Sequence, residues 1–188
     1  SEFHVLHAGL ALALGVQGGV DDVAVATPVS MRRDADTAGT VGMLISTVVL
    51  RTQMSAGQTV GELIGQVRDA DLAAIDHGLV AFDDVVALVD PPREAGRHPL
   101  VQVAFSVGGV GGALGDVGEL LEQRSEFDLH VVAVDNGGRW RLRVEYARDL
   151  FDDAAIAVVA ERVGAGVAAV VGDAATPVAA PAAATLAL

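Results

Sequence analysis

Hydroxyl side chains inside an apolar segment are the first candidates for chemistry in this sequence. Ser46 and Thr47 interrupt the run from Val41 to Arg51, which is otherwise apolar and rich in β-branched residues. A run of this kind predicts a strand buried on both faces of a sheet. Because a hydroxyl in such a strand needs a hydrogen-bond partner or a function, both residues are candidates for a functional role.

A histidine and an aspartate later in the chain, His130 and Asp135, raise the question of a general base with its orienting carboxylate. In a strand, an odd offset of five residues places two side chains on opposite faces, so these groups are not expected to meet. The segment is predicted instead as a hairpin, with strands over 127–134 and 139–146 around Asn136-Gly137-Gly138. Arginines alternate with apolar residues in the second strand, which indicates a solvated sheet face rather than a partner surface.

No metal or phosphate site is predicted. His4 and His7 lie three residues apart, but no third ligand is evident, so they are interpreted as two histidines of a semi-buried helix. The chain has no cysteine, which excludes disulfides and thiolate ligands. The glycine-rich segment 107–118 lacks the Gly-Lys-Ser/Thr ending of a phosphate-binding loop and is interpreted as a flexible connection. No other general-base motif is present, so no catalytic residue is expected in this chain.

The composition limits the fold and the partners. A chain of 188 residues suits one domain, and 52% hydrophobic but only 4% aromatic residues imply a core of small aliphatic side chains. The net charge of −13 disfavours nucleic acid and anionic membrane lipid as partners. No apolar run reaches the about 18 residues that span a bilayer, and no secretory signal is recognised, so the expected location is cytoplasmic.

The pattern of apolar residues and breakers predicts helices and strands followed by a linker. Thr59 and Glu62 form a capping box that opens a helix to about Asp76, and Asp152 is the expected N-cap of the last helix. The Ala- and Pro-rich residues 173–188 are predicted as an interdomain linker. In chain order, the expected elements are a helix at 1–14, a strand at 21–27 closed by Pro28, a loop at 30–40, the strand at 41–51, a turn at 54–58, helices at 59–76 and 82–89, a strand at 100–107, the hairpin and the final helix.

Three segments have the patterns, in order, of one known family. The segment from Gly42 to Arg51 is similar to Gly-x-Phe-Val-Asn-Thr…Arg, with Ser46 in place of asparagine. The segment from His77 to Asp83 is similar to His-Gln-Asp-x-Pro-Phe-Glu, and its histidine and Phe82 match. The segment from Arg93 to Phe105 is close to Arg-Asp-x-Ser-x-Asn-Pro-Leu-Phe-Gln-Val-x-Phe. Together they resemble the condensation domains of nonribosomal peptide synthetases, in the chloramphenicol-acetyltransferase-like superfamily.

This resemblance implies an α/β fold, a two-layer sandwich in which helices pack on a mixed β-sheet. Residues 1–172 resemble the C-terminal lobe of a V-shaped domain whose two lobes enclose a tunnel. In the family, the phosphopantetheine arms of two carrier proteins enter this tunnel, and the amine of an acceptor thioester attacks a donor thioester to form an amide. The family's catalytic motif, His-His-x-x-x-Asp-Gly, is absent from this chain, so the isolated chain is expected to be inactive.

The resemblance also implies roles for particular residues and partners. The loop Thr27–Arg33 resembles the tunnel floor, and the segment 107–118 resembles the latch. No cofactor is expected to bind directly, and the expected partners are the N-terminal lobe, peptidyl carrier proteins and an adenylation domain. The expected tunnel residues are Ser46, Thr47, Arg51 and Thr27, and the expected structural residues of the motifs are His77, Phe82, Arg93 and Pro99.

Two alternatives remain at this point. One is the matching lobe of a wax-ester-type or polyketide-associated acyltransferase, which shares the fold but not the motif from Arg93 to Phe105. The other is a non-catalytic condensation-like domain that recruits a tailoring enzyme. In each case a single lobe is expected to expose apolar surface that its other half would bury.

Overall fold

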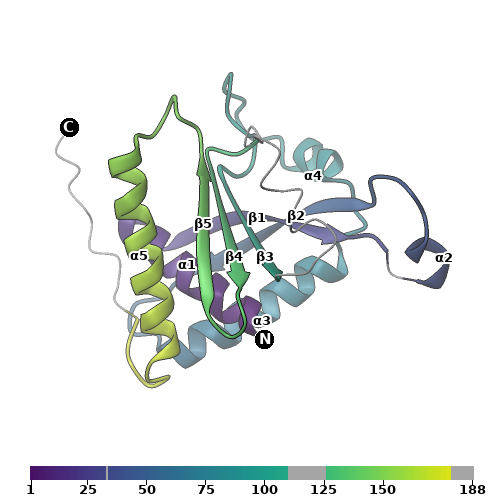
Figure 1. The fold of residues 1–188 in the computed structure, drawn as a ribbon. Helices are drawn as coiled ribbons and strands as arrows, with labels where there is room; N and C mark the ends of the chain where they lie inside the picture. Colours follow the sequence, from purple (N-terminus) through teal and green to yellow (C-terminus); the bar gives the residue numbers. More distant parts are fainter. Residues whose placement is uncertain (33, 110–125, 179–188) are drawn as a thin grey trace.

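The computed structural model describes residues 1–32, 34–109 and 126–178 (Figure 1). Local sequence signals set several element ends: Thr59 and Glu62 form the expected capping box of α3, and the Asp152 carboxylate accepts from the Ala155 N–H at the start of α5. The elements are α1 (Glu2–Gly18), β1 (Asp22–Ser30), α2 (Ala35–Ala38), β2 (Ile45–Gln53), α3 (Val60–Asp76), α4 (Phe82–Val89), β3 (Val103–Gly109), β4 (Leu129–Asp135), β5 (Trp140–Tyr146) and α5 (Asp153–Val171).

The five strands form one mixed sheet in the order β2-β1-β3-β4-β5 (Figure 1). Strands β1 and β2 pair antiparallel, β3 and β4 pair parallel, and β4 and β5 form the antiparallel hairpin that the sequence predicts. Strands β1 and β3 run parallel but meet at a single register pair, Ala26 with Ala104. The unit β1–β2 is therefore joined to the unit β3–β5 by one narrow contact within the sheet.

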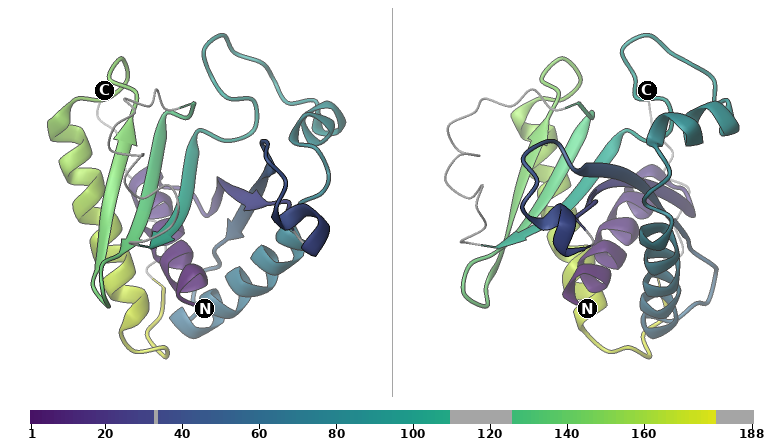
Figure 2. Two further views of the ribbon diagram at one scale, coloured as in Figure 1. Left: turned by 45° about the vertical axis from the view of Figure 1, so that its right-hand side comes forward. Right: turned by 90° about the vertical axis from the view of Figure 1, so that its right-hand side faces the viewer.

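Helices α1, α3 and α5 form the second layer of the sandwich and cover one face of the sheet (Figure 2). Apolar side chains of alternate strand positions point to these helices, among them Val25, Leu50, Phe105 and Val131. The two-layer α/β architecture and the mixed sheet predicted from the sequence are thus confirmed.

The opposite side of the sheet, called the second face below, carries a smaller apolar cluster and then polar residues. Ala26, Val101 and Ala104 are buried there. Side chains alternate along a strand, and the residues next to Ser106 of β3 and His130 of β4 point to the helices. Ser106 and His130 therefore point to the second face.

Strand β2 is an edge strand, so the prediction of a central strand buried on both faces is wrong. Val41 and Met43, which that prediction includes, precede the strand and are 99% and 90% exposed. An apolar run indicates that a segment is buried in the assembled protein. It does not show whether other parts of the same chain cover both of its faces. Burial alternates along the strand instead, with Val48, Leu50 and Thr52 buried.

Several other predicted boundaries also differ. Helix α1 continues past residue 14 and ends where Gly19 adopts a left-handed conformation. Strand β1 continues through Pro28, because that residue lies beyond the single pair with β3 and its missing N–H costs no bond to that strand. The predicted loop at 30–40 contains α2, capped by the Asp34 carboxylate, and β3 begins at residue 103 rather than 100.

Residues 173–178, predicted as the start of a linker, pack against the first turn of α3. The Val60 N–H donates to the Thr176 carbonyl at 2.9 Å, and the Gly61 N–H donates to the Ala174 carbonyl at 2.8 Å. These bonds satisfy N–H groups that the first turn of a helix leaves without an intrahelical partner. Val178 is buried, so the folded part extends beyond the predicted boundary at 172. The remainder of the predicted linker, 179–188, lies outside the described residues.

Helix α5 is long and apolar enough, by length and composition alone, to cross a membrane. This differs from the expectation that no segment would reach that length. In the fold, α5 packs against α1 and β5. Ile156, Val163 and Val170 are buried along one side, so this side of α5 is part of the core.

Two glycines allow α1 and α5 to approach closely. A Cβ added at Gly166 would lie 2.3 Å from the carbonyl oxygen of Gly9, and a Cβ added at Gly9 would lie 2.6 Å from the Val167 Cα. Both neighbours are backbone atoms, which cannot move aside without shifting a helix. By contrast, a Cβ at Gly164 would meet nothing within 4 Å.

We therefore expect opposite effects of the same substitution at Gly166 and Gly164. Gly166→Ala should lower the free energy of unfolding by about 2 kcal/mol, since it forces the two helices apart. Gly164→Ala should raise it by up to about 1 kcal/mol, because alanine favours the helix. Thermal and urea unfolding followed by circular dichroism would measure both, and equal changes in the two variants would contradict the proposed helix contact.

Candidate functional site

Three adjacent strands bring a serine, a histidine and a glutamate together on the second face. Ser106 Oγ of β3 lies 2.9 Å from Nε2 of His130 on β4. Nδ1 of the same ring lies 3.5 Å from Oε2 of Glu145 on β5, and Arg143 Nη2 lies 3.0 Å from Glu145 Oε1. These side chains are called the Ser106 cluster below. Their hydroxyl, imidazole and carboxylate follow one another in the order that is found in sites where a base activates a hydroxyl nucleophile.

The surroundings of His130 favour its neutral form. Burial lowers the pKa of His130 below its ordinary value of 6.5, Arg143 acts in the same direction, and Glu145 acts in the opposite direction. A carboxylate next to Nδ1 favours the tautomer with the proton on that atom, which leaves Nε2 as the acceptor for the Ser106 hydroxyl. The side chains of His130 and Glu145 retain 26% and 24% exposure, so the cluster is within reach of a ligand.

The sequence analysis considered His130 only with Asp135, predicted that the two do not meet, and did not identify Glu145 as the carboxylate beside His130. The expected separation from Asp135 is correct, because Asp135 accepts from the Gly138 N–H in the hairpin turn instead. The register of the hairpin places His130 opposite Glu145. That register follows from the turn, so counting back from Asn136-Gly137-Gly138 would have found this partner. No signal in the sequence pointed to Ser106, which comes from a different segment.

The expected tunnel residues are divided between the two faces of the sheet. Thr47 and Arg51 point to the second face with Val49, whereas Ser46 points to the helix side with Val48. The two neighbouring hydroxyls therefore cannot line the same surface.

Of the other two expected tunnel residues, Thr27 is buried and Arg51 pairs with a carboxylate. Thr27 is 3% exposed and lies on the helix side, and it belongs to β1 rather than to a loop. Arg51 donates from Nε and Nη2 to the Asp22 carboxylate at 2.9 and 2.5 Å, and these bonds lower the pKa of Asp22. The other predicted parts of the tunnel fall partly outside the described residues: residue 33 of the floor loop and most of the latch segment 107–118.

A histidine and aspartate cluster that the sequence analysis missed lies inside the core. Nδ1 of His4 and Nδ1 of His7 each lie 3.0 to 3.1 Å from the Asp71 carboxylate, which accepts from both rings. The side chains of His7 and Asp71 are fully buried, so the cluster joins α1 to α3 and cannot meet a substrate. In the part of the chain that the structure describes, no group of histidines and acidic residues has the arrangement of a metal site.

Comparison with known proteins places these features in a family. Residues 3–185 match the sequence profile described as Condensation domain. The chain belongs to the condensation-domain family. Among curated relatives, chondramide synthase cmdD of Chondromyces crocatus is 30% identical over 91% of this chain, and the isonitrile lipopeptide synthase of Mycobacterium tuberculosis (strain ATCC 25618 / H37Rv) is 33% identical over 86%. The chain spans only 5% and 7% of their lengths.

Solved structures agree on the fold. The X-domain from teicoplanin biosynthesis aligns with a TM-score of 0.79 at 23% identity, over 93% of this chain and 42% of its own. The first condensation domain of the calcium-dependent antibiotic synthetase, in complex with a substrate analogue, aligns with a TM-score of 0.72 at 21% identity, over 93% of this chain and 39% of its own. This condensation-family chain thus corresponds in extent to about two fifths of those structures.

The remaining residues of the family motifs, His77, Phe82, Arg93 and Pro99, lie between strands β2 and β3. His77 Nδ1 lies 2.8 Å from the Ala73 carbonyl at the end of α3, and the Phe82 ring lies 5.0 Å from that of His98, which contacts Phe127 at 4.7 Å. Burial lowers the pKa of His98. Pro99 follows it and is half-buried. Arg93 is exposed, so its predicted structural role has no visible basis in this chain.

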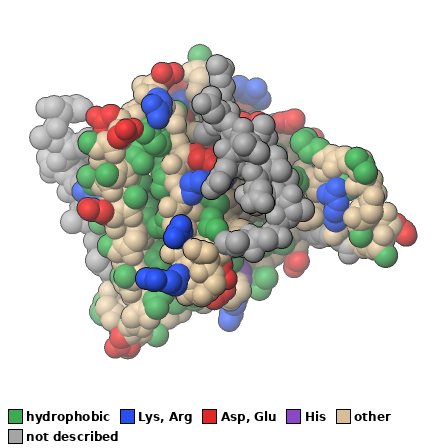
Figure 3. All heavy atoms as spheres, in the orientation of Figure 1, with side chains coloured by type: hydrophobic (Ala, Val, Ile, Leu, Met, Phe, Trp, Pro, Cys, Tyr) green, Lys and Arg blue, Asp and Glu red, His purple; other side chains and the backbone are tan. Residues whose placement is uncertain are grey.

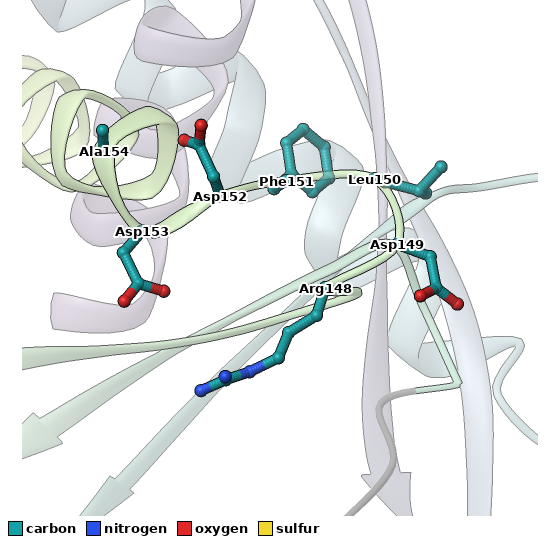
Figure 4. Close-up of a pocket in the computed structure, with 7 residues that line it drawn as sticks. All are labelled: Arg148, Asp149, Leu150, Phe151, Asp152, Asp153 and Ala154. Atoms are coloured by element: carbon teal, nitrogen blue, oxygen red, sulfur yellow. The ribbon is translucent and has the colours of Figure 1, made fainter.

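A surface pocket lies where β5 leads into α5 (Figure 4). Its lining runs without interruption from Arg148 to Ala154, and it is open to solvent. The residues of this turn serve local structure: Asp152 caps α5, and the Tyr146 hydroxyl donates to Asp153, which raises the pKa of that tyrosine. We therefore do not regard this hollow as the functional site of the condensation-family chain.

The buried carboxylate of Asp71 should be essential for stability. Asp71→Ala is expected to lower the free energy of unfolding by about 3 kcal/mol, since it leaves two buried imidazoles without their partner. Asp69→Ala, on the exposed side of the same helix, should change it by less than about 0.5 kcal/mol. Chemical unfolding of both variants at neutral pH tests this, and a loss below about 1 kcal/mol in Asp71→Ala would show that the cluster is dispensable.

Proposed function

We propose that this chain forms the C-terminal lobe of a condensation domain in a nonribosomal peptide synthetase. In this proposal the second face is one wall of a tunnel in which two carrier-bound thioesters meet. The extent of the match supports one lobe, because the chain aligns over 93% of itself but only 39% to 42% of the solved structures. The family's histidine motif does not occur in the sequence, which agrees with a catalytic base on the other lobe.

The observation that carries the proposal is the exposed apolar surface at the start of the first family motif. Val41, Met43 and Ile45 are 99%, 90% and 52% exposed, although the surrounding sequence is that of a buried strand. Leu79 and Leu88, in the connection after α3 and in α4, are also exposed. Clusters of exposed apolar residues mark surfaces that another protein or another part of the same protein covers. The N-terminal lobe is the partner that the family match suggests.

The reaction itself follows from the family. The amine of an acceptor aminoacyl thioester attacks the carbonyl carbon of a donor thioester, an amide forms, and the donor thiol leaves. This lobe would contribute position rather than acid–base chemistry, since a tunnel wall holds the two phosphopantetheine arms in line. Peptidyl carrier proteins and an adenylation domain would supply the substrates, and the cytoplasm would be the location of such an assembly.

Thr47 and Ser46 provide a matched test of which face forms the wall. In the complete two-lobed domain, Thr47→Tyr should reduce the rate of amide formation at least about tenfold, because a bulky ring on the second face obstructs the tunnel. Ser46→Tyr should have little effect, because it points to the helix side. Amide product from loaded carrier proteins, measured by mass spectrometry, gives both rates, and the reverse order of effects would place the tunnel on the other face.

The proposed function is tested by adding the missing half. The chain alone should form no amide from loaded carriers, and co-expression with an N-terminal lobe that carries His-His-x-x-x-Asp-Gly should restore condensation. A stable two-lobe complex without amide formation would favour a recruitment domain. Transfer of the acyl group to an alcohol instead of an amine would favour the acyltransferase alternative.

A further inference from the structure

We propose that Ser106, His130 and Glu145 form a nucleophilic serine site that hydrolyses acyl thioesters. The choice of thioester as the substrate class rests on the proposed function, whereas the activated serine itself rests only on the geometry of the Ser106 cluster. This site lies on the second face, and it gives the lobe an activity distinct from the amide formation assigned to the two-lobed domain.

The first support is the alignment of the three groups across neighbouring strands. The Ser106 hydroxyl lies 2.9 Å from the imidazole nitrogen that is free to accept its proton. Glu145 lies 3.5 Å from the other ring nitrogen, where its negative charge favours the tautomer with the proton on that nitrogen. The three strands pair directly with one another, so the arrangement is held by the sheet and not by loops.

The second support is accessibility, which separates this cluster from the other histidines with carboxylate partners. His7 and Asp71 are fully buried and link two helices, so their arrangement is structural. His130 and Glu145 each keep about a quarter of their side-chain surface exposed. A general base needs contact both with its nucleophile and with the incoming substrate, and only the Ser106 cluster meets both conditions among the described residues.

The third support is the charge around His130. The groups that face it are Glu145 and Arg143 of β5, besides Ser106 of β3. Burial and Arg143 lower the pKa of the imidazole, so it is neutral and able to accept a proton at pH 7. The Arg143 guanidinium lies 3.0 Å from Glu145 Oε1, so it holds that carboxylate beside the imidazole. Figure 3 shows basic side chains in a row over β5.

The chemical steps balance without any added cofactor. Ser106 Oγ attacks the thioester carbonyl carbon while its proton passes to His130 Nε2. The C–S bond then breaks, and the thiol leaves with the proton from the imidazolium, so that the acyl group is esterified to Ser106. Water, deprotonated by the same imidazole, attacks this ester and releases the carboxylic acid and the free serine. Overall, a thioester and water become an acid and a thiol.

The absence of cysteine from the sequence allows a direct test of nucleophile activation. Ser106→Cys introduces the sole thiol of the chain next to His130. Its alkylation by iodoacetamide should be at least about tenfold faster at pH 7 than that of the control variant Ser46→Cys, because a neighbouring base increases the thiolate fraction. Adding His130→Gln to Ser106→Cys should remove this difference. Equal alkylation rates in the two single variants would overturn the proposal.

The unmodified serine is tested with a fluorophosphonate probe and with an acyl thioester of N-acetylcysteamine. Labelling should map to Ser106 and be absent from Ser106→Ala, and thioester hydrolysis should fall about 100-fold or more in Ser106→Ala and His130→Gln. The rate of labelling should rise with pH through a midpoint below 6.5 and then level off, because only the neutral imidazole accepts the proton. Circular dichroism of each variant confirms folding.

This test is separate from the test of the proposed function. In the two-lobed domain, thioester hydrolysis and amide formation are measured in the same reaction, and Ser106→Ala should remove the hydrolysis. If amide formation fails but Ser106 is labelled, the proposed condensation function is wrong and the serine site stands. If no labelling occurs between pH 5 and 9 in a folded protein, the serine site is wrong, whatever the result for amide formation.

Discussion

Helix α1 is the element on which the rest of the fold depends, because it connects parts that the sheet joins only weakly. Strands β1 and β2 are joined to strands β3, β4 and β5 through a single register pair between β1 and β3. Helix α1 packs on β1, on α3 and on α5, and the His7 ring stacks on Phe105 of β3 at a centroid distance of 6.0 Å. Its contact with α3 is the shared carboxylate of Asp71, and its contact with α5 is the close approach at Gly9 and Gly166. A helix with so many different neighbours is buried nearly all round, which explains its uniformly apolar sequence.

Elements set by local signals could be predicted from the sequence, and elements set by distant contacts could not. The capping box of Thr59 and Glu62 gave the start of α3, and the glycines at 137 and 138, both with positive φ, gave the hairpin turn. The place of β2 in the sheet was not predictable in this way. Its apolar composition indicates burial, but whether the burying surface belongs to this chain is a question of tertiary structure. The exposed residues before β2 give the physical answer, since the described chain leaves that surface uncovered.

The same distinction holds for the functional residues. Alternation along a strand correctly separated His130 from Asp135, and hairpin register alone would have led to Glu145. Ser106 and Asp71 reach their partners only through parallel strand pairing and helix packing, which no short motif records. Alternation also shows why Ser46 and Thr47 could not both line one surface. Family resemblance identified the strand that carries them, but only the geometry distinguishes the two neighbours.

The short segment after α5 determines where any following part of a polypeptide is tethered. The chain leaves α5, turns back and is fastened by the Thr176 and Ala174 carbonyls to the start of α3, and the Val178 N–H donates to the Gln58 carbonyl at 2.7 Å. Val178, the last described residue, therefore lies beside the turn between β2 and α3. In a longer polypeptide, tension from the C-terminal side would therefore act first on residues 173–178 and on the start of α3, and not on the end of α5.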